Sequence, residues 1–163
     1  MASGDVLCVF TPRGNEPPTS NFATLDTRNT QCVLDFDTST QETAIWSGIM
    51  PYNYAGGNLV VYVHSSMTSA TSGTVGWDVT FERIGTSQDT DSDGFATAQT
   101  ITAATVPGTS GNLLVQSVTC TFGSTGTDSI AAGEKFRLRV RRDVANDNAT
   151  GDAELHAVVV REA

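Results

Sequence analysis

The sequence predicts an all-β protein, an antiparallel two-sheet sandwich with a jelly-roll-like arrangement. Almost every apolar run alternates apolar and polar residues with a period of two, which is the pattern of a half-buried strand. These runs are bounded by Gly, Pro, Asn, Asp or Ser, which favour turns, and no segment makes a convincing long helix. About eight to ten short antiparallel strands in a chain of 163 residues imply two packed layers.

Ten segments carry this pattern. The predicted strands lie near residues 5–10, 22–28, 31–37, 42–50, 58–67, 74–84, 97–105, 112–122, 134–144 and 152–162. In the segment 74–84, the alternation of side chains across a strand places four residues on the core face: Val75, Trp77, Val79 and Phe81. It predicts three outward residues: Asp78, Thr80 and Glu82.

The length of the chain fits one domain, which we expect to span residues 1–163. Residues 11–21 interrupt the strand pattern with the Pro-rich stretch TPRGNEPPTS. This composition favours extended backbone. We therefore expect either an arm that reaches a neighbouring subunit or a linker that crosses the edge of the sandwich.

The charge balance is acidic, with 9 Lys and Arg against 18 Asp and Glu, or a net charge of −9. Affinity for phosphates depends on clustered cations, so nucleic acid is not an expected partner. No run approaches the roughly 18 apolar residues of a membrane span, and the first residues lack the pattern of a secretion signal. We expect a protein that folds in a cytoplasm and does not bind membranes.

Three cysteines, Cys8, Cys32 and Cys120, lie far apart in predicted strands and form no CxxC pair. Each has apolar neighbours at alternate positions, so we expect buried free thiols that act as small apolar side chains. A disulfide or a reactive thiol is the alternative.

Four arginines of this acidic chain lie in EKFRLRVRRD, residues 134–143. Strand alternation places Arg137, Arg139 and Arg141 on the face opposite the apolar side chains. We expect a cross-strand ladder of ion pairs, either with the partner strand of a terminal hairpin or with the outward acids of the segment 74–84. The strand near residues 152–162 would present Asp152, Glu154 and His156 on one face. The candidate partners are Asp152, Glu154, Asp78 and Glu82. The alternative is an interface in which the arginines dock on an acidic partner.

The segment SQDTDSDGFATAQ contains Asp89, Asp91, Asp93 and Gly94, which match the opening D-x-D-x-D-G of a calcium loop. The twelfth position of such a loop is Thr100 here instead of a bidentate glutamate, and flanking helices are missing. We predict a solvated acidic turn and no metal site, with weak calcium binding as the alternative.

The loop GIMPYNYAGGNL contains Tyr52 and Tyr54 between proline and glycine residues. Exposed tyrosines beside acidic groups suit a sugar-binding platform. Tyrosines in sandwich loops also cap the end of a core, and this second interpretation is the favoured one.

The sequence has no positive indication of catalysis. The histidines, His64 and His156, have no neighbouring residue at the spacing of a metal site or a catalytic triad. Neither a G-x-S-x-G motif nor a P-loop or dinucleotide fingerprint occurs. We therefore predict that the chain is not an enzyme and that it has no cofactor.

Two stretches of the chain resemble small virion structural proteins of tailed bacteriophages. They are SGIMPYNYAGGNLVVYVHSSMTSATSGTVGWDVTFERI at residues 47–84, and residues 130–162, which contain IAAGE, FRLRVRRD and GDAELHAVVVRE. The nearest functional group is the head-decoration or cement proteins, which are commonly β-sandwiches.

The resemblance implies a non-enzymatic protein that binds the outside of a phage head and clamps neighbouring subunits of the major capsid protein. It also implies self-association, preferably as a trimer, and a location on the capsid exterior of the virion after synthesis in the host cytoplasm.

A hypothesis of a different class rests on the loop residues. The chain would be a carbohydrate-binding module of a host-adhesion structure, with Tyr52 and Tyr54 as sugar contacts. Sugar binding would occur with or without a calcium ion at Asp89, Asp91 and Asp93.

Overall fold

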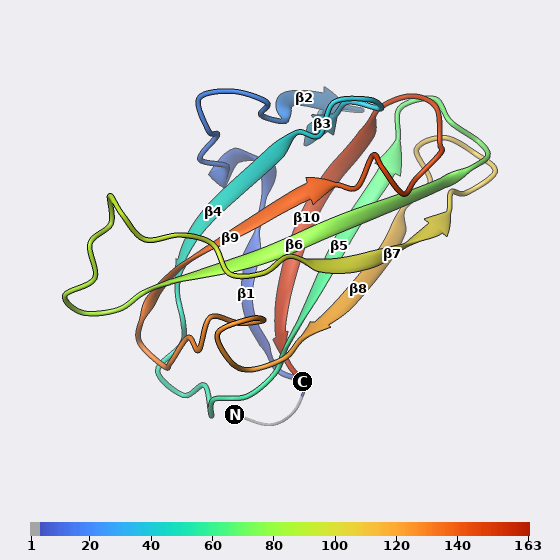
Figure 1. The fold of residues 1–163 in the computed structure, drawn as a ribbon. Coiled ribbons are helices and arrows are strands. Elements are labelled where there is room, and N and C mark those ends of the chain that lie inside the picture. The colour runs from blue at the N-terminus through green and yellow to red at the C-terminus, as the bar shows by residue number, and fades with distance from the viewer. Residues whose placement is uncertain (1–3) are drawn as a thin grey trace.

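The computed structural model describes residues 4–163, and in this range it contains ten strands and one short 3-10 helix, η1 (Pro12–Gly14) (Figure 1). The strands are β1 (Val6–Phe10), β2 (Thr24–Arg28), β3 (Gln31–Phe36), β4 (Thr43–Ile49), β5 (Leu59–Met67), β6 (Thr74–Ile84), β7 (Gln99–Thr105), β8 (Leu114–Cys120), β9 (Lys135–Arg142) and β10 (Ala153–Glu162). Each predicted strand is found, and most end one or two residues short of the expected bounds.

The strands form two antiparallel sheets that pack face to face, as predicted (Figure 1). Sheet A has the order β2-β3-β10-β5-β8, and β1 pairs with the second half of β10. Sheet B has the order β4-β9-β6-β7 and lies in front of sheet A in Figure 1. The fold is thus an antiparallel two-sheet sandwich of the jelly-roll type.

The core lies between the two sheets and contains the side chains of both tryptophans. Phe36 of sheet A meets the edge of Trp77 of sheet B, with 5.1 Å between the ring centroids. All four predicted core residues of β6 are buried: Val75, Trp77, Val79 and Phe81.

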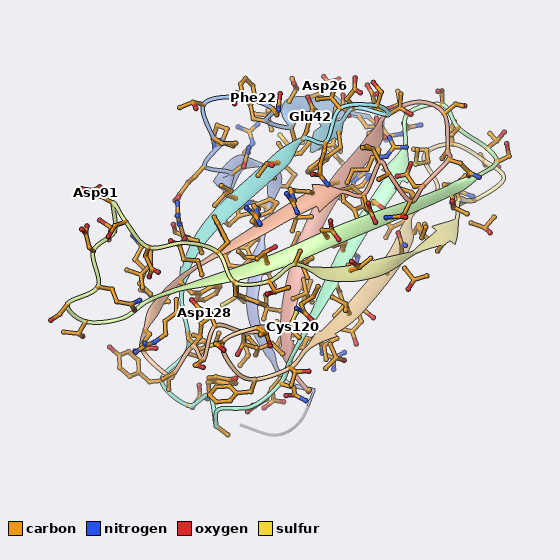
Figure 2. All side chains as sticks on the ribbon, viewed as in Figure 1. Phe22, Asp26, Glu42, Asp91, Cys120 and Asp128 are labelled. Atoms are coloured by element: carbon orange, nitrogen blue, oxygen red, sulfur yellow. The ribbon has the colours of Figure 1, made fainter. Side chains whose placement is uncertain are left out.

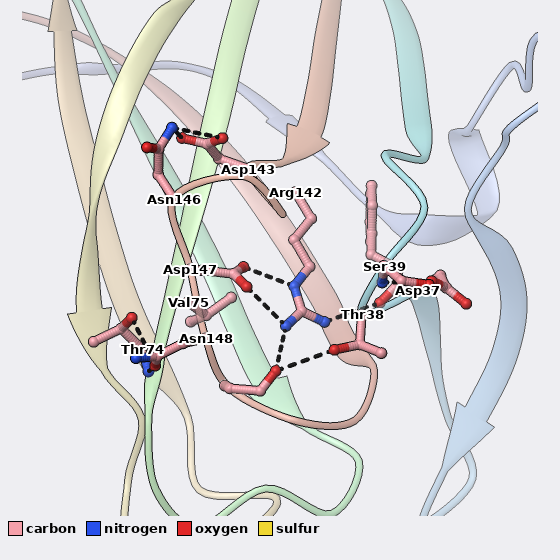
Figure 3. Close-up of polar contacts among 12 residues, drawn as sticks. Asp37, Thr38, Ser39, Thr74, Val75, Arg142, Asp143, Asn146, Asp147 and Asn148 are labelled. Carbon is pink, nitrogen blue, oxygen red and sulfur yellow. Dashed lines mark hydrogen bonds and ion pairs between the residues drawn. The ribbon is translucent and has the colours of Figure 1, made fainter.

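The predicted terminal hairpin between residues 134–144 and 152–162 is wrong, because β9 belongs to sheet B and β10 to sheet A. The connection crosses from one sheet to the other and encloses the side chain of Arg142, which is fully buried (Figure 3). Arg142 donates to both carboxylate oxygens of Asp147, at 2.8 and 3.2 Å, and to the carbonyls of Ala149 and Gly151, both at 2.8 Å. These bonds hold the crossing connection in place.

Two of the three residues of β6 expected to face solvent, Thr80 and Glu82, are buried instead. The loop after β6, residues 85–98, returns across the outer face of sheet B, and the ring of Phe95 lies against Arg137 and Arg139. The alternation of β6 is as predicted, but a loop covers its outward side.

Residues 11–21 run along the open edge of β4. The amide of Glu16 donates to the carbonyl of Ile45 at 2.7 Å, and the indole of Trp46 donates to the carbonyl of Thr11 at 2.8 Å. The segment therefore blocks an edge that otherwise offers unpaired backbone groups.

The three cysteines are free. Cys120 is fully buried, and its burial raises the pKa of the thiol to about 12. Cys8 and Cys32 are only partly buried, so the expected burial holds in full for one thiol. Within residues 4–163 the structure has no helix with the length and apolar character needed to cross a membrane.

Candidate ligand-binding site

The arginine ladder of β9 exists, but its partners come from the neighbouring strand β6. Arg137 forms an ion pair with the buried carboxylate of Glu82, and Arg141 lies 3.7 Å from Asp78. Arg139 has its guanidinium 4.5 Å from the ring centroid of Phe95 and 3.4 Å from the hydroxyl of Thr80.

The expected partners Asp152 and Glu154 lie elsewhere, because β10 is in the other sheet. Arg137 and Arg141 keep 31% and 25% of their side chains exposed. Two of the three arginines therefore pair with carboxylates of β6 and remain partly exposed, and Arg139 packs on Phe95.

The acidic loop residues make local hydrogen bonds. Asp89 accepts from the amide of Asp91 at 2.9 Å, and Asp93 accepts from the side chain of Gln88 at 2.7 Å. Asp91 lies at the tip of the loop, away from both sheets (Figure 2). In the described part of the chain, no three His, Cys, Asp or Glu side chains come together as a group able to hold a metal ion.

The two tyrosines of the β4–β5 loop have different environments. Tyr54 is only 5% exposed and caps the core, and its hydroxyl bonds with the backbone of Gly57. Tyr52 is 86% exposed and lies against Gly133, where an added Cβ would come within 2.6 Å of its ring. The pair does not form a joint platform, and Tyr52 alone is open to a ligand.

The structure reveals a polar cluster on the outer face of sheet A, the face turned away from sheet B. Arg28 ends β2, and a two-residue turn with positive φ at Asn29 and Thr30 returns the chain into β3. On β10 a bulge falls between Leu155 and Ala157, where the pairing with β5 skips His156. Strand alternation places His156 on the outer face with Glu154 while Leu155 stays in the core, and the bulge shifts the alternation of the residues that follow, so that Val158 faces the core.

The cluster is a connected chain of hydrogen bonds among Arg28, Glu154, Ser66 and His156. Glu154 Oε2 accepts from Arg28 Nη1 at 2.7 Å and from the hydroxyl of Ser66 at 2.9 Å. The Oγ of Ser66 also lies 2.8 Å from Nε2 of His156. Because Ser66 has one hydroxyl proton and donates it to Glu154, Nε2 carries the proton of the neutral imidazole, and Nδ1 is left as an acceptor.

A pocket of about 330 Å³ opens beside this cluster. We call it the polar pocket, and its lining residues are Arg28, Asn29, Gln31, Gly111, Leu113 and His156. Nε and Nη2 of Arg28 and Nδ1 of His156 make no hydrogen bond within residues 4–163, and none of the three atoms is sealed from solvent. The pocket thus offers both donors and an acceptor to a ligand.

Gly111 is required where the β7–β8 loop passes Arg28. Its φ is +84°, and a Cβ added there would lie 2.5 Å from Nη2 of Arg28. A side chain at this position would push the guanidinium out of place.

Burial shifts the protonation of two groups on this face. It lowers the pKa of His156, with smaller effects from Glu154, Arg28 and His64, so the ring is neutral at neutral pH. Burial, and to a lesser extent the nearby Glu154 and Asp26 carboxylates, raises the pKa of Asp35, on β3, to about 6.

The cluster is not arranged as a catalytic triad. In a triad the acid contacts the second nitrogen of the histidine, whereas here the carboxylate of Glu154 contacts the hydroxyl of Ser66.

Sequence reasoning found part of this cluster. It predicted that Glu154 and His156 share one face of their strand, and they do. It missed Arg28 and Ser66, because no motif links four residues on three strands that are far apart in the chain. The short turn predicted between residues 28 and 31 was the available indication that Arg28 ends a strand.

A second, apolar pocket of about 280 Å³ lies between the segment of residues 11–21 and β2. Its walls include Pro12, Pro17, Leu34 and two exposed residues, Phe22 and Leu25. Arg13 and Asn15 are its main polar side chains, so it offers a ligand fewer hydrogen-bonding groups than the polar pocket does.

Comparison with known proteins finds similar folds but no similar sequences. No protein-family model and no curated protein matches the chain. Many solved structures match it, and the three described next do so over almost its whole length.

One is a C-terminal CBM6 module of a laminarinase from Zobellia galactanivorans, with a TM-score of 0.55, 9% identity and coverage of 95% of this chain and 98% of that one. Another is a CBM6 carbohydrate-binding module of a lichenase from Cellvibrio mixtus, solved with cellotriose, with a TM-score of 0.52, 10% identity and coverage of 98% and 99%. The third is a CBM22 xylan-binding domain from Paenibacillus barcinonensis, with a TM-score of 0.52, 13% identity and coverage of 100% and 99%.

These matches correct the expectation of a phage head-decoration protein. The structures that the chain resembles are carbohydrate-binding modules, and a major capsid protein and a trimer of copies are no longer the expected partners. The resemblance to virion proteins rested on strands and turns, which any β-sandwich shares. At this level of identity the comparison establishes the fold and does not identify a ligand.

Proposed function

We propose that the chain is a non-catalytic carbohydrate-binding module and that the polar pocket on sheet A binds a sugar ring. The observation that carries this proposal is the set of unused groups in the pocket: two nitrogens of Arg28 that donate and Nδ1 of His156 that accepts. A sugar hydroxyl both donates and accepts, so adjacent hydroxyls can pair with both kinds of group.

The size and walls of the pocket also fit. Its volume of about 330 Å³ lies near the lower end of the roughly 300–1,000 Å³ range of small-ligand sites. Leu113, which is 54% exposed, supplies an apolar wall for the CH groups of a sugar. The Cellvibrio mixtus module of similar fold was solved with cellotriose, and the Paenibacillus barcinonensis module is described as xylan-binding.

The test is a binding screen against soluble neutral polysaccharides, including β-glucans and xylans, by affinity gel electrophoresis and then titration calorimetry. We expect saturable binding to at least one of them. His156→Leu removes the acceptor, and the loss of one hydrogen bond, about 0.5–1.5 kcal/mol, weakens binding about two- to twelvefold.

Tyr52→Ala is the matched control, because Tyr52 is the exposed aromatic residue of a loop outside the polar pocket. We expect it to bind like the wild type. Weaker binding of Tyr52→Ala with normal binding of His156→Leu would move the site to the β4–β5 loop. Absence of binding to every polysaccharide would refute the proposal.

A further inference from the structure

The outer face of sheet A continues from the polar pocket along β5. Side chains two residues apart point to the same side of a strand, so His64, Tyr62 and Val60 follow Ser66 on this face. His64 is close enough to His156 to affect its pKa. From Ser66 to Tyr62 the strand advances about 13 Å, more than the width of one sugar ring.

This face is open to solvent on both sides of β5. Val115 of β8 is 47% exposed and Val9 of β1 is 57% exposed. By contrast, the loop 85–98 covers the equivalent face of sheet B, where Glu82 has no exposed surface. A long ligand can therefore lie along sheet A but not along the covered part of sheet B.

The ring of Tyr62 is held in place. The guanidinium of Arg161 lies 5.5 Å from its centroid, and Nε of Arg161 in turn donates to the carbonyl of Gly4 at 2.7 Å. The Tyr62 hydroxyl makes no hydrogen bond within residues 4–163 and is not sealed from solvent. An aromatic ring that is fixed before binding loses little side-chain entropy when a ligand packs on it.

The outer face of sheet A has apolar side chains next to polar ones, and a sugar chain has CH and OH groups that can contact both kinds. Apolar side chains, Val9, Val115 and Val159, flank polar ones on β5 and β8, His64, Tyr62 and Ser117. No carboxylate occurs on this stretch of β5, and the charged group that lies against Tyr62 is the guanidinium of Arg161, whose Nε donates to the carbonyl of Gly4. The surface suits an uncharged ligand with CH and OH groups along its length.

We propose that the face binds a chain of several neutral sugar units, with one unit in the polar pocket and the next ones along β5 as far as Tyr62. This inference rests on the proposed function and specifies its ligand as an oligosaccharide and not a single sugar. A second copy of the protein is the competing occupant of an open sheet face.

The test is calorimetric titration with cello- and xylo-oligosaccharides from the monosaccharide to the hexasaccharide. We expect the affinity of the wild type to rise at least tenfold from the monosaccharide to the tetrasaccharide and then to level off. Tyr62→Ala lowers the affinity for the hexasaccharide about three- to tenfold and leaves the affinity for the shortest ligand that binds unchanged.

Tyr62→Phe is the conservative variant, because it keeps the ring and its stacking on Arg161 and loses only the hydroxyl. It distinguishes the loss of a ring contact with the ligand from a general loss of folding. It is expected to bind the hexasaccharide more tightly than Tyr62→Ala does, and to lose at most the about two- to twelvefold of one hydrogen bond. Tyr52→Ala is the control for removal of an exposed aromatic ring, and it is expected to leave the length dependence unchanged.

The two proposals fail in different ways. Equal affinity for short and long ligands, or no effect of Tyr62→Ala on the hexasaccharide, overturns the extended site and leaves the pocket in place. If no oligosaccharide binds, both proposals are wrong. A wild-type dimer that Tyr62→Ala converts to a monomer in light scattering also overturns the inference, because it identifies the face as a contact between copies.

Discussion

Arg142 is the residue whose replacement tests the crossing connection between the two sheets. It ends β9 on the core side and has no exposed surface. The side chain of its ion-pair partner, Asp147, is only 2% exposed. Arg142→Met keeps a side chain of similar length and removes every hydrogen bond to Asp147, Ala149 and Gly151. A buried carboxylate then remains without its partner.

Removing one member of a buried ion pair costs about 3–5 kcal/mol, because the remaining charge is uncompensated. A domain of ordinary stability has about 5–15 kcal/mol in total, so this is a large share. For a chain of this size the expected drop in Tm is about 6–20 °C. The measurement is urea denaturation followed by intrinsic tryptophan fluorescence, with calorimetry for Tm.

Arg83→Met is the matched control. Arg83 also binds a carboxylate with two nitrogens, that of Glu134, but its side chain is 36% exposed. Solvent screens this pair, so we expect a loss well below 1 kcal/mol. The double variant Arg142→Met/Asp147→Leu removes both charges and is expected to recover part of the stability. Equal small losses for Arg142→Met and Arg83→Met would refute the structural role of the buried pair.

Three further predictions concern the outer face of sheet A. Asp35 has a pKa of about 6 in the folded state, above its ordinary value of 3.8, so its contribution to stability is full below pH 3.8 and is lost as the pH rises through 6. Asp35→Asn is therefore expected to raise the urea midpoint at pH 7 and to have little effect at pH 4; a lower midpoint at pH 7 would contradict this. His156 has a lowered pKa, so sugar affinity is expected to be constant above pH 6.5 and to fall below it, as protonation turns Nδ1 from an acceptor into a donor. Titrations over this pH range check the prediction, and a profile that His156→Gln leaves unchanged would rule it out. Gly111→Ala is expected to lower the free energy of unfolding by about 1–3 kcal/mol and to weaken sugar binding, because Gly111 has a positive φ and an added Cβ would meet Arg28. Gly108 has no positive φ, and an added Cβ there would have no heavy atom within 4 Å, so Gly108→Ala is expected to change neither property. Similar results for the two variants would contradict the steric argument.

Strand positions and faces could be predicted from the sequence, because side-chain alternation is a local property. The apolar residues of β6 face the core as expected, and Glu154 and His156 share a face. Pairing between strands is not local. The segment after β9 contains ordinary turn residues, and nothing in its pattern distinguishes a hairpin from a crossing between sheets.

The burial of Glu82 also could not be predicted from a local pattern. Alternation correctly placed Glu82 on the outer face of β6, but the loop that begins after Ile84 returns over this face and places Phe95 on Arg137 and Arg139. Coverage of one sheet face and not the other depends on how a loop folds, which alternation does not encode. The polar pocket was missed for a related reason, since only the pairing of strands that are far apart in the chain brings Arg28 and Ser66 to Glu154 and His156.

The most direct test of the binding face on sheet A is to map a bound sugar by NMR. Backbone amide shifts would be followed during titration of the labelled protein with the oligosaccharide that binds best in the screen. We expect saturable shifts that cluster at Asn29, Gln31, Leu113 and His156, and that extend along β5 to Tyr62. Shifts that cluster around Tyr52, or no shifts with any neutral sugar that was tested, would contradict it.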